Sequence, residues 1–403
     1  MGCRSSLFAP EAQVEEIEIG GYRVPRISNE WWGAQQRQGH SLHEISYRAC
    51  FKGELPAFWL SRLSKPQDVV LDPFMGRGTT LVEAALRGRV PWGLDLNPLS
   101  QVLVAPRLAP PVLHEVEDRL RRIEREPVIT EKVQGEPDLS PFYEEKTLSE
   151  LRRLRHWFQE RADDTDHVDR WLRMVATNRL TGHSSGFFSG RTMPPNQAVS
   201  IETQRKLNER NGEKPPRRKL PEIIQKKTRS LLRSLDLEQR RRLEQVQPLS
   251  RLEVGDASEV LPFEDGSVDC TITSPPFLDV INYAGDNWLR CWFNGIDPER
   301  VAAKIKALRS VEAWSAVMGQ VFEELYRVTR PGGHVVFEVG EVKRGTVRLE
   351  EYALPVAIVA GFDPICVAIQ VQDFTKTANC WGVDNNNKGT NTQRMIVLHK
   401  DES

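Results

Sequence analysis

Four consecutive residues combine a hydroxyl, two prolines and an aromatic ring directly after the apolar run VDCTI: Ser274, Pro275, Pro276 and Phe277. Prolines stiffen this tetrapeptide and carry no amide hydrogen, so its carbonyls have no competing local donor. Together with the hydroxyl, these carbonyls can accept hydrogen bonds from an exocyclic amino group and orient its nitrogen lone pair. The aromatic ring can stack on a base drawn out of a duplex. The alternative is a proline-rich turn that only ends a strand.

A second candidate, the glycine loop, lies between the apolar run at 68–74 and a helical pattern that ends near Gly88. Two glycines after a strand and before a helix let a ligand approach the backbone closely, beside free amides at the helix start. The strand end Asp72, Pro73 and Phe74 runs directly into this loop, which contains Gly76, Gly78, Thr79 and Thr80. Many strand-to-helix turns contain glycine for geometric reasons alone, so a second signal is needed.

Asp95 supplies that signal, because it lies 17 residues after Gly78 at the end of the next apolar run, VPWGLDL. Nucleotide-binding folds place a carboxylate that accepts the ribose hydroxyl at this position. The chain has neither a GxGxxG dinucleotide pattern nor a GxxxxGK[ST] phosphate loop. A ligand with a nucleoside and no polyphosphate therefore fits best.

The tetrapeptide and the glycine loop each follow a predicted strand, so the arrangement of the strands determines whether the two motifs lie close together. The apolar runs at 68–74 and 90–96, with the helical pattern between them, predict one strand–helix–strand unit of a doubly wound α/β sheet. Five further strand candidates follow residue 249: SRLEVGDA, VDCTITSPP, GHVVFEVG, FDPICVAIQV and RMIVLHK. Helices are expected near 311–329 and 349–360. The count predicts seven strands, two of them before a long region without strand signal and five after it.

That region, residues 111–249, carries Leu and Trp at helical intervals and predicts a helical insertion between 1–110 and 250–403. The whole chain has a formal charge of -1, but residues 171–250 contain 17 Lys and Arg against 7 Asp and Glu, a local charge of +10. This basic block indicates either a polyanion-binding surface or a solvated helical face, and charge alone does not separate the two.

The glycine loop and Asp95 together resemble the cofactor motifs of the amino-methylating DNA methyltransferases: DPFMGRGTT is similar to the family's FxGxG loop, and GLDLNPL to its acidic second motif. The resemblance implies a Rossmann-like seven-stranded methyltransferase fold. It also implies S-adenosyl-L-methionine as the cofactor, with Asp95 on the ribose. The contacts that it implies in the loop are Asp72, Pro73, Phe74, Gly76, Gly78, Thr79 and Thr80. Further cofactor contacts implied outside the loop are Asp256, Ala257, Ser46, Tyr47 and Lys52. A turn-stabilising role is the alternative for Asp256, and an amphipathic entry helix is the alternative for 40–56.

The tetrapeptide resembles the same family's catalytic motif, (Asp/Asn/Ser)-Pro-Pro-(Tyr/Phe). Ser in first place is typical of the cytosine-N4 branch, whereas Asp is typical of the adenine-N6 branch. The resemblance implies that Ser274 accepts a hydrogen bond from the cytosine amine and that Phe277 stacks on the flipped base. Methyl transfer would then be direct, with the protein positioning the two groups. Cytosine-C5 methylation is excluded, because it needs a Cys nucleophile, usually in a Pro-Cys pair, and the chain has no such pair.

Methyltransferases with this order of motifs place target recognition between them, which would give the basic block the task of reading duplex DNA. Arg, Asn and Gln side chains can pair with base edges, whereas KPPRRK suits phosphate contacts. The candidate DNA contacts are Arg179, His183, Arg191, Asn196, Gln197, Arg217, Arg218 and Lys219. For each residue alone, a plain surface role is the alternative. The polar loop 382–394 resembles a recurring tail in one branch of the family.

Composition narrows the class of protein. No apolar run approaches the roughly 18–20 residues that cross a bilayer, and the first thirty residues lack a signal-peptide pattern. The six Cys form no CxxC pair and the eight His no HExxH set, so neither a disulfide framework nor a metal site is expected. These features predict a cytoplasmic protein without membrane association.

The expected function is site-specific DNA methylation at cytosine N4, with base flipping, in a restriction–modification system whose cognate endonuclease would be a further partner. Three alternatives remain open at this level. They are an adenine-N6 DNA methyltransferase, an RNA amino-methyltransferase, and a catalytically inactive DNA-binding module that uses the cofactor as a sensor.

Overall fold

The computed structural model describes residues 12–33, 39–47, 50–133, 135–192, 198–276, 283–305, 308, 310–342, 346–371 and 392–402. Three residues proposed above for the site, Phe277, Asn196 and Gln197, lie outside the described residues. So does the polar loop up to residue 391.

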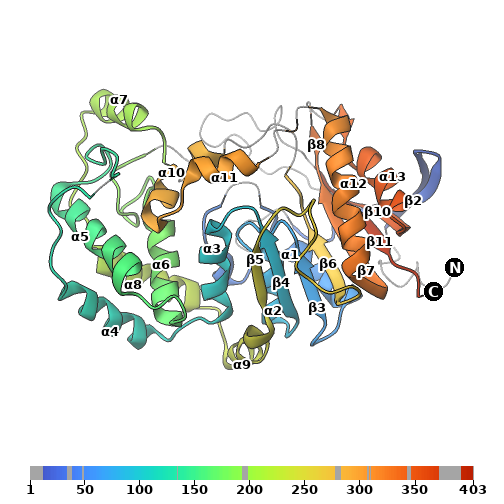
Figure 1. Ribbon diagram of the computed structural model, residues 1–403, viewed down its shortest axis with the longest axis horizontal. Helices are drawn as coiled ribbons and strands as arrows, with labels where there is room; N and C mark the ends of the chain where they lie inside the picture. The colour runs from blue at the N-terminus through green and yellow to red at the C-terminus, as the bar shows by residue number, and fades with distance from the viewer. Residues whose placement is uncertain are drawn as a thin grey trace.

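Within the described part of the chain, one nine-stranded sheet has the order β1-β2-β10-β11-β7-β6-β3-β4-β5 (Figure 1). Its strands are β1 (Gln13–Ile19), β2 (Tyr22–Asn29), β3 (Val69–Asp72), β4 (Val90–Asp95), β5 (Arg251–Val254), β6 (Val268–Thr273), β7 (Thr329–Val339), β10 (Asp363–Val371) and β11 (Thr392–His399). The strands from β7 to β5 pair in parallel, and β11 is antiparallel to both β7 and β10. The predicted Rossmann-like fold is confirmed and all seven predicted strands are present, but the sheet has nine strands, four of them before the insertion.

The hairpin of β1 and β2 extends this sheet beyond the seven expected strands. β2 pairs in parallel with β10, and β1 is the edge strand among the described residues. Val24 and Ile27 of β2 are buried, while most side chains of β1 are exposed. A separate two-stranded ribbon is made by β8 (Glu341–Val342) and β9 (Val347–Arg348).

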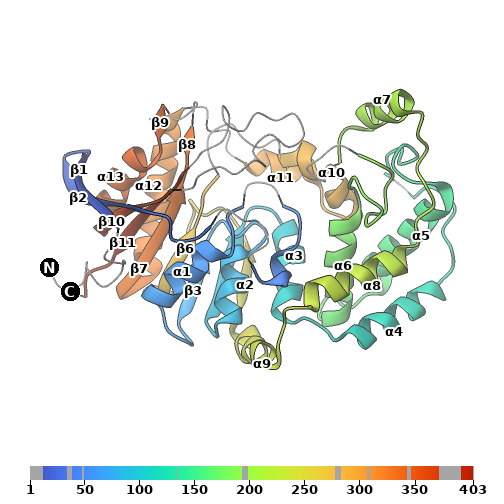
Figure 2. The same cartoon turned by 180° about the vertical axis from the view of Figure 1, so that it is seen from behind.

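Helices cover both faces of the sheet. Those outside the insertion are α1 (Glu54–Leu63), α2 (Thr79–Leu86), α3 (Leu99–Leu108), α10 (Tyr283–Asn294), α11 (Pro298–Lys304), α12 (Val311–Val328) and α13 (Glu350–Val359), with the short η1 (Ser41–His43). Figures 1 and 2 show α12 and α13 on one face and α1 and α2 on the other. Trp314 and Phe322 of α12 and Trp59 of α1 are fully buried, because each helix turns its apolar stripe to the strands. None of the described helices is both long enough and apolar enough to cross a membrane.

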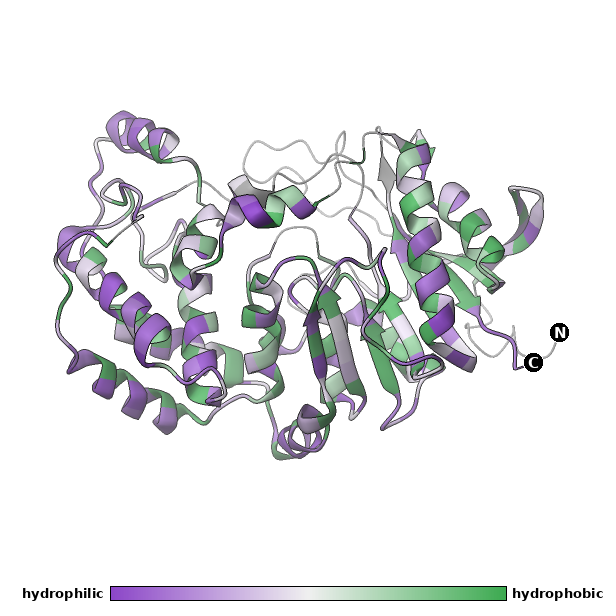
Figure 3. Ribbon diagram, viewed as in Figure 1, coloured by the Kyte–Doolittle hydropathy of each residue, from purple (hydrophilic) through white to green (hydrophobic). Residues whose placement is uncertain are grey.

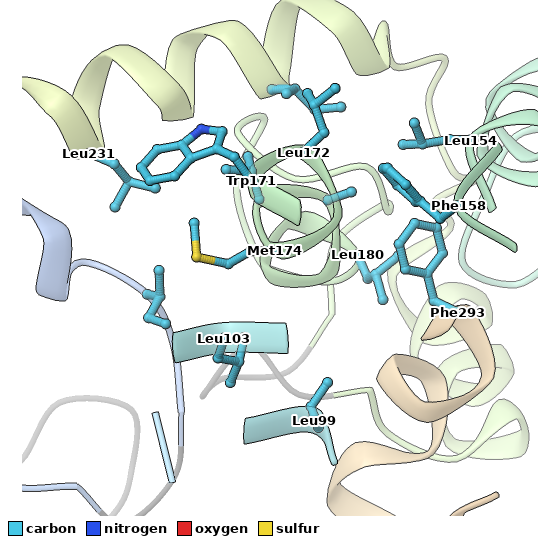
Figure 4. Packing of buried hydrophobic residues seen from close by; sticks show 14 of the residues in the cluster. Leu99, Leu103, Leu154, Phe158, Trp171, Leu172, Met174, Leu180, Leu231 and Phe293 are labelled. Atoms are coloured by element: carbon cyan, nitrogen blue, oxygen red, sulfur yellow. The ribbon is translucent and has the colours of Figure 1, made fainter. Parts of the chain in front are cut away.

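The insertion is helical. Its elements are α4 (Leu113–Glu124), α5 (Glu145–His156), η2 (Trp157–Arg161), α6 (His167–Arg179), α7 (Ile201–Asn211), α8 (Leu220–Leu232), α9 (Leu237–Val246) and η3 (Gln247–Leu249). The exposed faces of α4, α5 and α8 are mainly hydrophilic, whereas the strands are mainly hydrophobic (Figure 3). In Figure 4, Leu99 and Leu103 of α3 face the same interior as Trp171 and Met174 of α6. The insertion therefore shares one continuous core with the sheet's own helices.

Helix α10 follows the tetrapeptide in sequence but packs on the insertion. Arg155 donates to the Trp292 carbonyl (3.0 Å), and Arg173 donates to the Asn294 side chain (2.9 Å). The Asn294 amide in turn donates to the Thr177 hydroxyl of α6 (2.9 Å). The first helix after the candidate catalytic motif is thus fixed to the insertion.

Candidate active site

The two candidate motifs meet where the strand order reverses, between β3 and β6. The Thr273 hydroxyl at the end of β6 donates to the Asp72 carboxylate at the end of β3 (2.6 Å). Open α/β sheets bind their ligands at this edge and at this point of reversal. Asp72 is buried, and burial raises its pKa to about 7 despite the hydrogen bonds from Thr273 and the Phe74 amide.

Asp95 ties the glycine loop to the neighbouring strand. Its carboxylate accepts one hydrogen bond from the Gly76 amide (2.8 Å) and one from the Asn97 amide (2.9 Å). Gly76 and Gly78 have φ of 48° and 72°, in the left-handed region that favours glycine. A Cβ on Gly78 would lie 2.5 Å from a methyl carbon of Val104, so the loop passes close against α3.

The threonines of the glycine loop turn their side chains into the protein. The Thr79 hydroxyl accepts from Arg77 (3.1 Å), and the Thr80 hydroxyl donates to the Ile272 carbonyl of β6 (2.9 Å). Their side chains therefore support the fold, and what they offer a ligand is their backbone amides at the start of α2. That cofactor contact stays a prediction for both residues.

Asp256 and Ala257 lie beside Asp95, at the end of the adjacent strand β5. The Gly255 amide donates to the Asp95 carbonyl (3.1 Å), which joins the two strand ends. The Asp256 carboxylate accepts from the Ser258 amide (2.9 Å) and hydroxyl (2.7 Å), the arrangement of a turn-stabilising Asp. Its position also suits a ligand that spans the ends of β3, β4 and β5.

The segment around Ser46 and Tyr47 covers the glycine loop. A Cβ on Gly76 would lie 3.4 Å from the Tyr47 ring, which puts the ring over the loop. Arg77 fastens the segment by donating to the carbonyls of His43 (3.3 Å), Ile45 (3.1 Å) and Phe51 (3.2 Å). The Ser46 amide donates to the Asn178 side chain of α6 (2.7 Å). Lys52 is half-buried and burial lowers its pKa.

Two residues outside the predicted set hold the tetrapeptide. The Ser274 hydroxyl donates to the Glu338 carboxylate of β7, and the Trp314 indole donates to the Pro276 carbonyl (3.0 Å). Pro275 is buried. Burial raises the pKa of Glu338 to about 7, and the hydrogen bond from Ser274 partly opposes this. Sequence reasoning missed Glu338, although a lone carboxylate in the apolar run GHVVFEVG was a usable signal.

The candidate DNA contacts fall into two groups. Arg179 lies over the Phe187 ring, 4.0 Å from its centroid, and the exposed His183 ring lies 6.4 Å from the same ring. In the second group, Arg217 pairs with Glu150 and Lys219 pairs with Glu222 (2.7 Å).

Arg191 is exposed, 3.9 Å from Glu213, and Arg218 is half-buried. Several of these cations thus already have carboxylate partners, and their binding to DNA stays a prediction.

Other hollows and clusters lie away from this edge. A cavity of about 700 Å³, lined by Trp31, Phe58 and Arg89 among others, opens at the amino ends of β3 and β4. Among the described residues, one group could hold a metal ion: Asp363, His399 and Asp401. It also lies at the end of the sheet opposite to Ser274, so no metal is assigned to the candidate site.

Comparison with known proteins finds a family match over the part of the chain that carries the glycine loop and Asp95. Residues 14–100 match the sequence model of a family described as DNA methylase (N6/N4). A curated relative, the type II methyltransferase M.MjaII of Methanocaldococcus jannaschii, is 33% identical over 69 residues. The match spans 17% of this chain and 13% of that relative. Both matches are to DNA methyltransferases, and they do not separate the N4 from the N6 branch.

Two solved methyltransferase structures are similar to parts of this chain. A putative DNA modification methylase of Thermus thermophilus, complexed with S-adenosyl-L-methionine, is 22% identical over 37% of this chain and 55% of that chain, with a TM-score of 0.24. A geranyl diphosphate C-methyltransferase of Streptomyces coelicolor is 10% identical over 87% of this chain and 76% of that chain, with a TM-score of 0.34.

Proposed function

We propose that the chain is an S-adenosyl-L-methionine-dependent DNA methyltransferase that methylates the exocyclic N4 amine of a flipped cytosine in duplex DNA. One observation carries the proposal: the Ser274 hydroxyl donates its hydrogen to Glu338, at the strand edge where Thr273 also bonds Asp72 of the cofactor motif. A serine that donates its only hydrogen to a carboxylate presents just oxygen lone pairs elsewhere. Such an oxygen can accept a hydrogen bond from an amine but has no hydrogen to donate to a carbonyl.

The residues of the glycine loop suit the proposed cofactor. Gly76 carries no side chain and has a positive φ, which leaves its backbone open to a ligand beside the Tyr47 ring. The amides of Thr79 and Thr80 at the helix start suit a carboxylate, and Asp95 supplies oxygen acceptors for ribose hydroxyls. When bound, the cofactor supplies an electrophilic methyl group on a sulfonium.

The chain's own part in the reaction is to orient the amine and remove its proton. Ser274 and the Pro275 carbonyl accept the two amine hydrogens, which directs the nitrogen lone pair away from them and toward the methyl group. Methyl transfer, in which the N–C bond would form and the S–CH₃ bond would break, would leave the nitrogen with a positive charge and one surplus proton. That proton passes to Ser274 as the serine hydrogen moves to Glu338, whose raised pKa makes it a suitable acceptor near neutral pH.

Cytosine N4 is proposed because of the Ser in first place of the tetrapeptide, and adenine N6 on the same scaffold is the second candidate. Recognition of a short duplex sequence is assigned to the insertion, with Arg179, His183 and Arg191 among the candidate contacts. A cognate restriction endonuclease would complete a restriction–modification pair. All four statements rest on the family resemblance together with the position of the insertion.

The test is incubation of the protein with unmethylated duplex DNA and labelled S-adenosyl-L-methionine, followed by digestion and mass spectrometry of the nucleosides. N4-methylcytosine is expected, and Ser274→Ala should reduce its formation about 100-fold or more while cofactor binding is retained. N6-methyladenine would transfer the proposal to the second candidate. Methylation of RNA in preference to DNA, or cofactor binding without any methylated product, would contradict it.

A further inference from the structure

Three cations belong to helices α6, α8 and α10. Helix α6 packs against both of the others, and α8 packs against η1, just before the segment that covers the glycine loop. The three cations are Arg179 at the end of α6, Lys227 in α8 and Arg290 in α10, named here the cationic junction. Next to Arg179 in sequence, Asn178 accepts from the Ser46 amide (2.7 Å), and Ser46 precedes the Tyr47 ring over Gly76. Arg179 of the junction is thus connected, through its neighbour Asn178 and through Ser46, to the Tyr47 ring that covers the candidate cofactor site.

The cationic junction is largely shielded from water. Arg290 is 6% exposed, and the Lys227 side chain is 12% exposed. Burial and repulsion by Arg290 lower the pKa of Arg179 to about 10. Burial and, next in size, repulsion by Arg179 lower the pKa of Lys227 to about 8. The charge of Arg179 is thus close enough to those of Lys227 and Arg290 to be destabilised by both.

Nearby acidic charge does not fully balance Arg179 and Lys227. Glu44 lies 3.8 Å from Lys227, but its carboxylate is also hydrogen-bonded by Arg233 and Ser230. Within the described ranges Arg179 forms no ion pair with a carboxylate, and its guanidinium instead covers the Phe187 ring. Burying positive charge that acidic groups do not compensate is costly, and binding an anion removes that cost.

We propose that the cationic junction binds a backbone phosphate of the nucleic acid, next to the nucleotide whose base enters the site. The proposal rests on the proposed function. Guanidinium groups match phosphate oxygens in pairs, and an ammonium adds a point charge. Two of the three residues belong to the insertion, and Phe187 lies in the loop that follows α6, which favours the nucleic acid over the cofactor's carboxylate as the anion.

Two lysines that are neighbours in α8 provide a matched test. Lys227 belongs to the junction, whereas Lys226 is exposed on another side of the helix. The affinity of the full chain for unmethylated duplex DNA is measured from about 50 to 200 mM salt. Each lost phosphate contact lowers the slope of log K against log salt by about 0.9. Lys227→Met should show this loss, and Lys226→Met should keep the wild-type slope.

Two further measurements on Lys227→Met are made without DNA. The variant should unfold at a temperature no lower than the wild type, because a repelling charge is removed. A clearly lower temperature would make Lys227 a structural partner of Glu44 and overturn the proposal. Titration with S-adenosyl-L-methionine should give wild-type affinity, and a loss of affinity with an unchanged DNA slope would assign the anion to the cofactor's carboxylate.

The outcomes also distinguish this proposal from the one it rests on. A wild-type chain that binds and methylates duplex DNA, with Lys227→Met retaining the full salt slope, contradicts only the phosphate site. A wild-type chain that binds no DNA contradicts both proposals.

Discussion

At the scale of single residues, the direction of one hydrogen bond determines what Ser274 can recognise. The hydroxyl presents a pure acceptor only while Glu338 is ionised and takes its hydrogen. A protonated Glu338 can itself donate to the serine oxygen, which would reverse the bond and free the serine hydrogen to point at the substrate. With a pKa of about 7, Glu338 changes between these two protonation states within the physiological pH range.

Glu338→Gln is therefore predicted to alter pH dependence in two ways. Folded Glu338 keeps its proton up to about pH 7, whereas the unfolded carboxyl loses it near 4.5, so this residue makes the folded state less stable as the pH rises between those values. The variant should gain stability over the wild type from pH 5 to pH 8, by up to ~3 kcal/mol at about 1.4 kcal/mol per pKa unit. Denaturant titrations at both pH values measure this difference.

The same variant should also lose the rise in methylation rate that the wild type is expected to show as the pH passes about 7. The control is the same Glu→Gln substitution at Glu350, a second buried carboxylate, which forms an ion pair with Arg394. Parallel pH–rate profiles for wild type and Glu338→Gln would refute the assigned role of Glu338.

At this scale, sequence patterns identified groups that act through local motifs and missed those that act across the sheet. Asp72, Gly76 and Asp95 stand beside recognisable turns, and the structure brings them together at one edge. Glu338 lies 64 residues after Ser274, and the two meet only because β7 pairs with β6. No local pattern encodes that pairing, so only the unusual charge in an apolar strand pointed to it.

At the scale of elements, the glycine loop lies between α3 on one side and, on the other, the segment around Ser46 and Tyr47, here called the covering segment. Gly78 needs both its positive φ and its missing side chain, because Val104 lies so close. Gly212, at the end of α7, has a similar φ of 62° but open space around it. Comparing substitutions at Gly78 and Gly212 therefore separates the cost of backbone strain from the cost of the steric contact with Val104.

Gly78→Ala should therefore destabilise the fold by about 2–4 kcal/mol, and Gly212→Ala by only about 1 kcal/mol. Chemical denaturation of the two variants measures the difference. Adding Val104→Ala to Gly78→Ala should recover part of the loss. Equal effects of the two glycine substitutions would mean that the contact with α3 is unimportant.

The covering segment depends on Arg77, which donates to three of its carbonyls. Arg77→Leu should free this segment and weaken binding of S-adenosyl-L-methionine about ten-fold or more, because each 1.4 kcal/mol of lost ordering is a factor of ten. Calorimetric titration gives the affinity. Arg125→Leu, at an exposed position after α4, is the control and should bind as the wild type does.

At the scale of the whole molecule, sequence patterns located the sheet and the insertion but not how they join. The strand runs were readable because buried parallel strands are continuous apolar stretches. The shared core was not, because Leu99 and Leu103 of α3, Trp171 of α6 and Phe293 of α10 come from distant parts of the chain. Periodicity indicates that a helix has an apolar face, but not which partner covers it.

Because that core is continuous, residues 111–249 alone should not form a cooperative unit. Excision would expose the side chains that pack on α3 and α10, so the fragment should lack a sharp thermal transition. In the full chain, amide protection of α6 and of β4 should be lost together in native-state hydrogen exchange. A fragment that unfolds as sharply as the full chain would show an independent domain instead.

The free edges of the nine-stranded sheet bear on self-association. An unpaired edge strand offers backbone groups to any other strand, and β5 limits this by its length of four residues. β1 is longer, but it places Glu15, Glu16 and Glu18 along the edge, all of them solvent-accessible. Although Glu15 pairs with Arg26, repulsion between the carboxylates of two copies should oppose pairing of their β1 edges. Acidification that protonates them should therefore promote edge-to-edge aggregation well before the core unfolds.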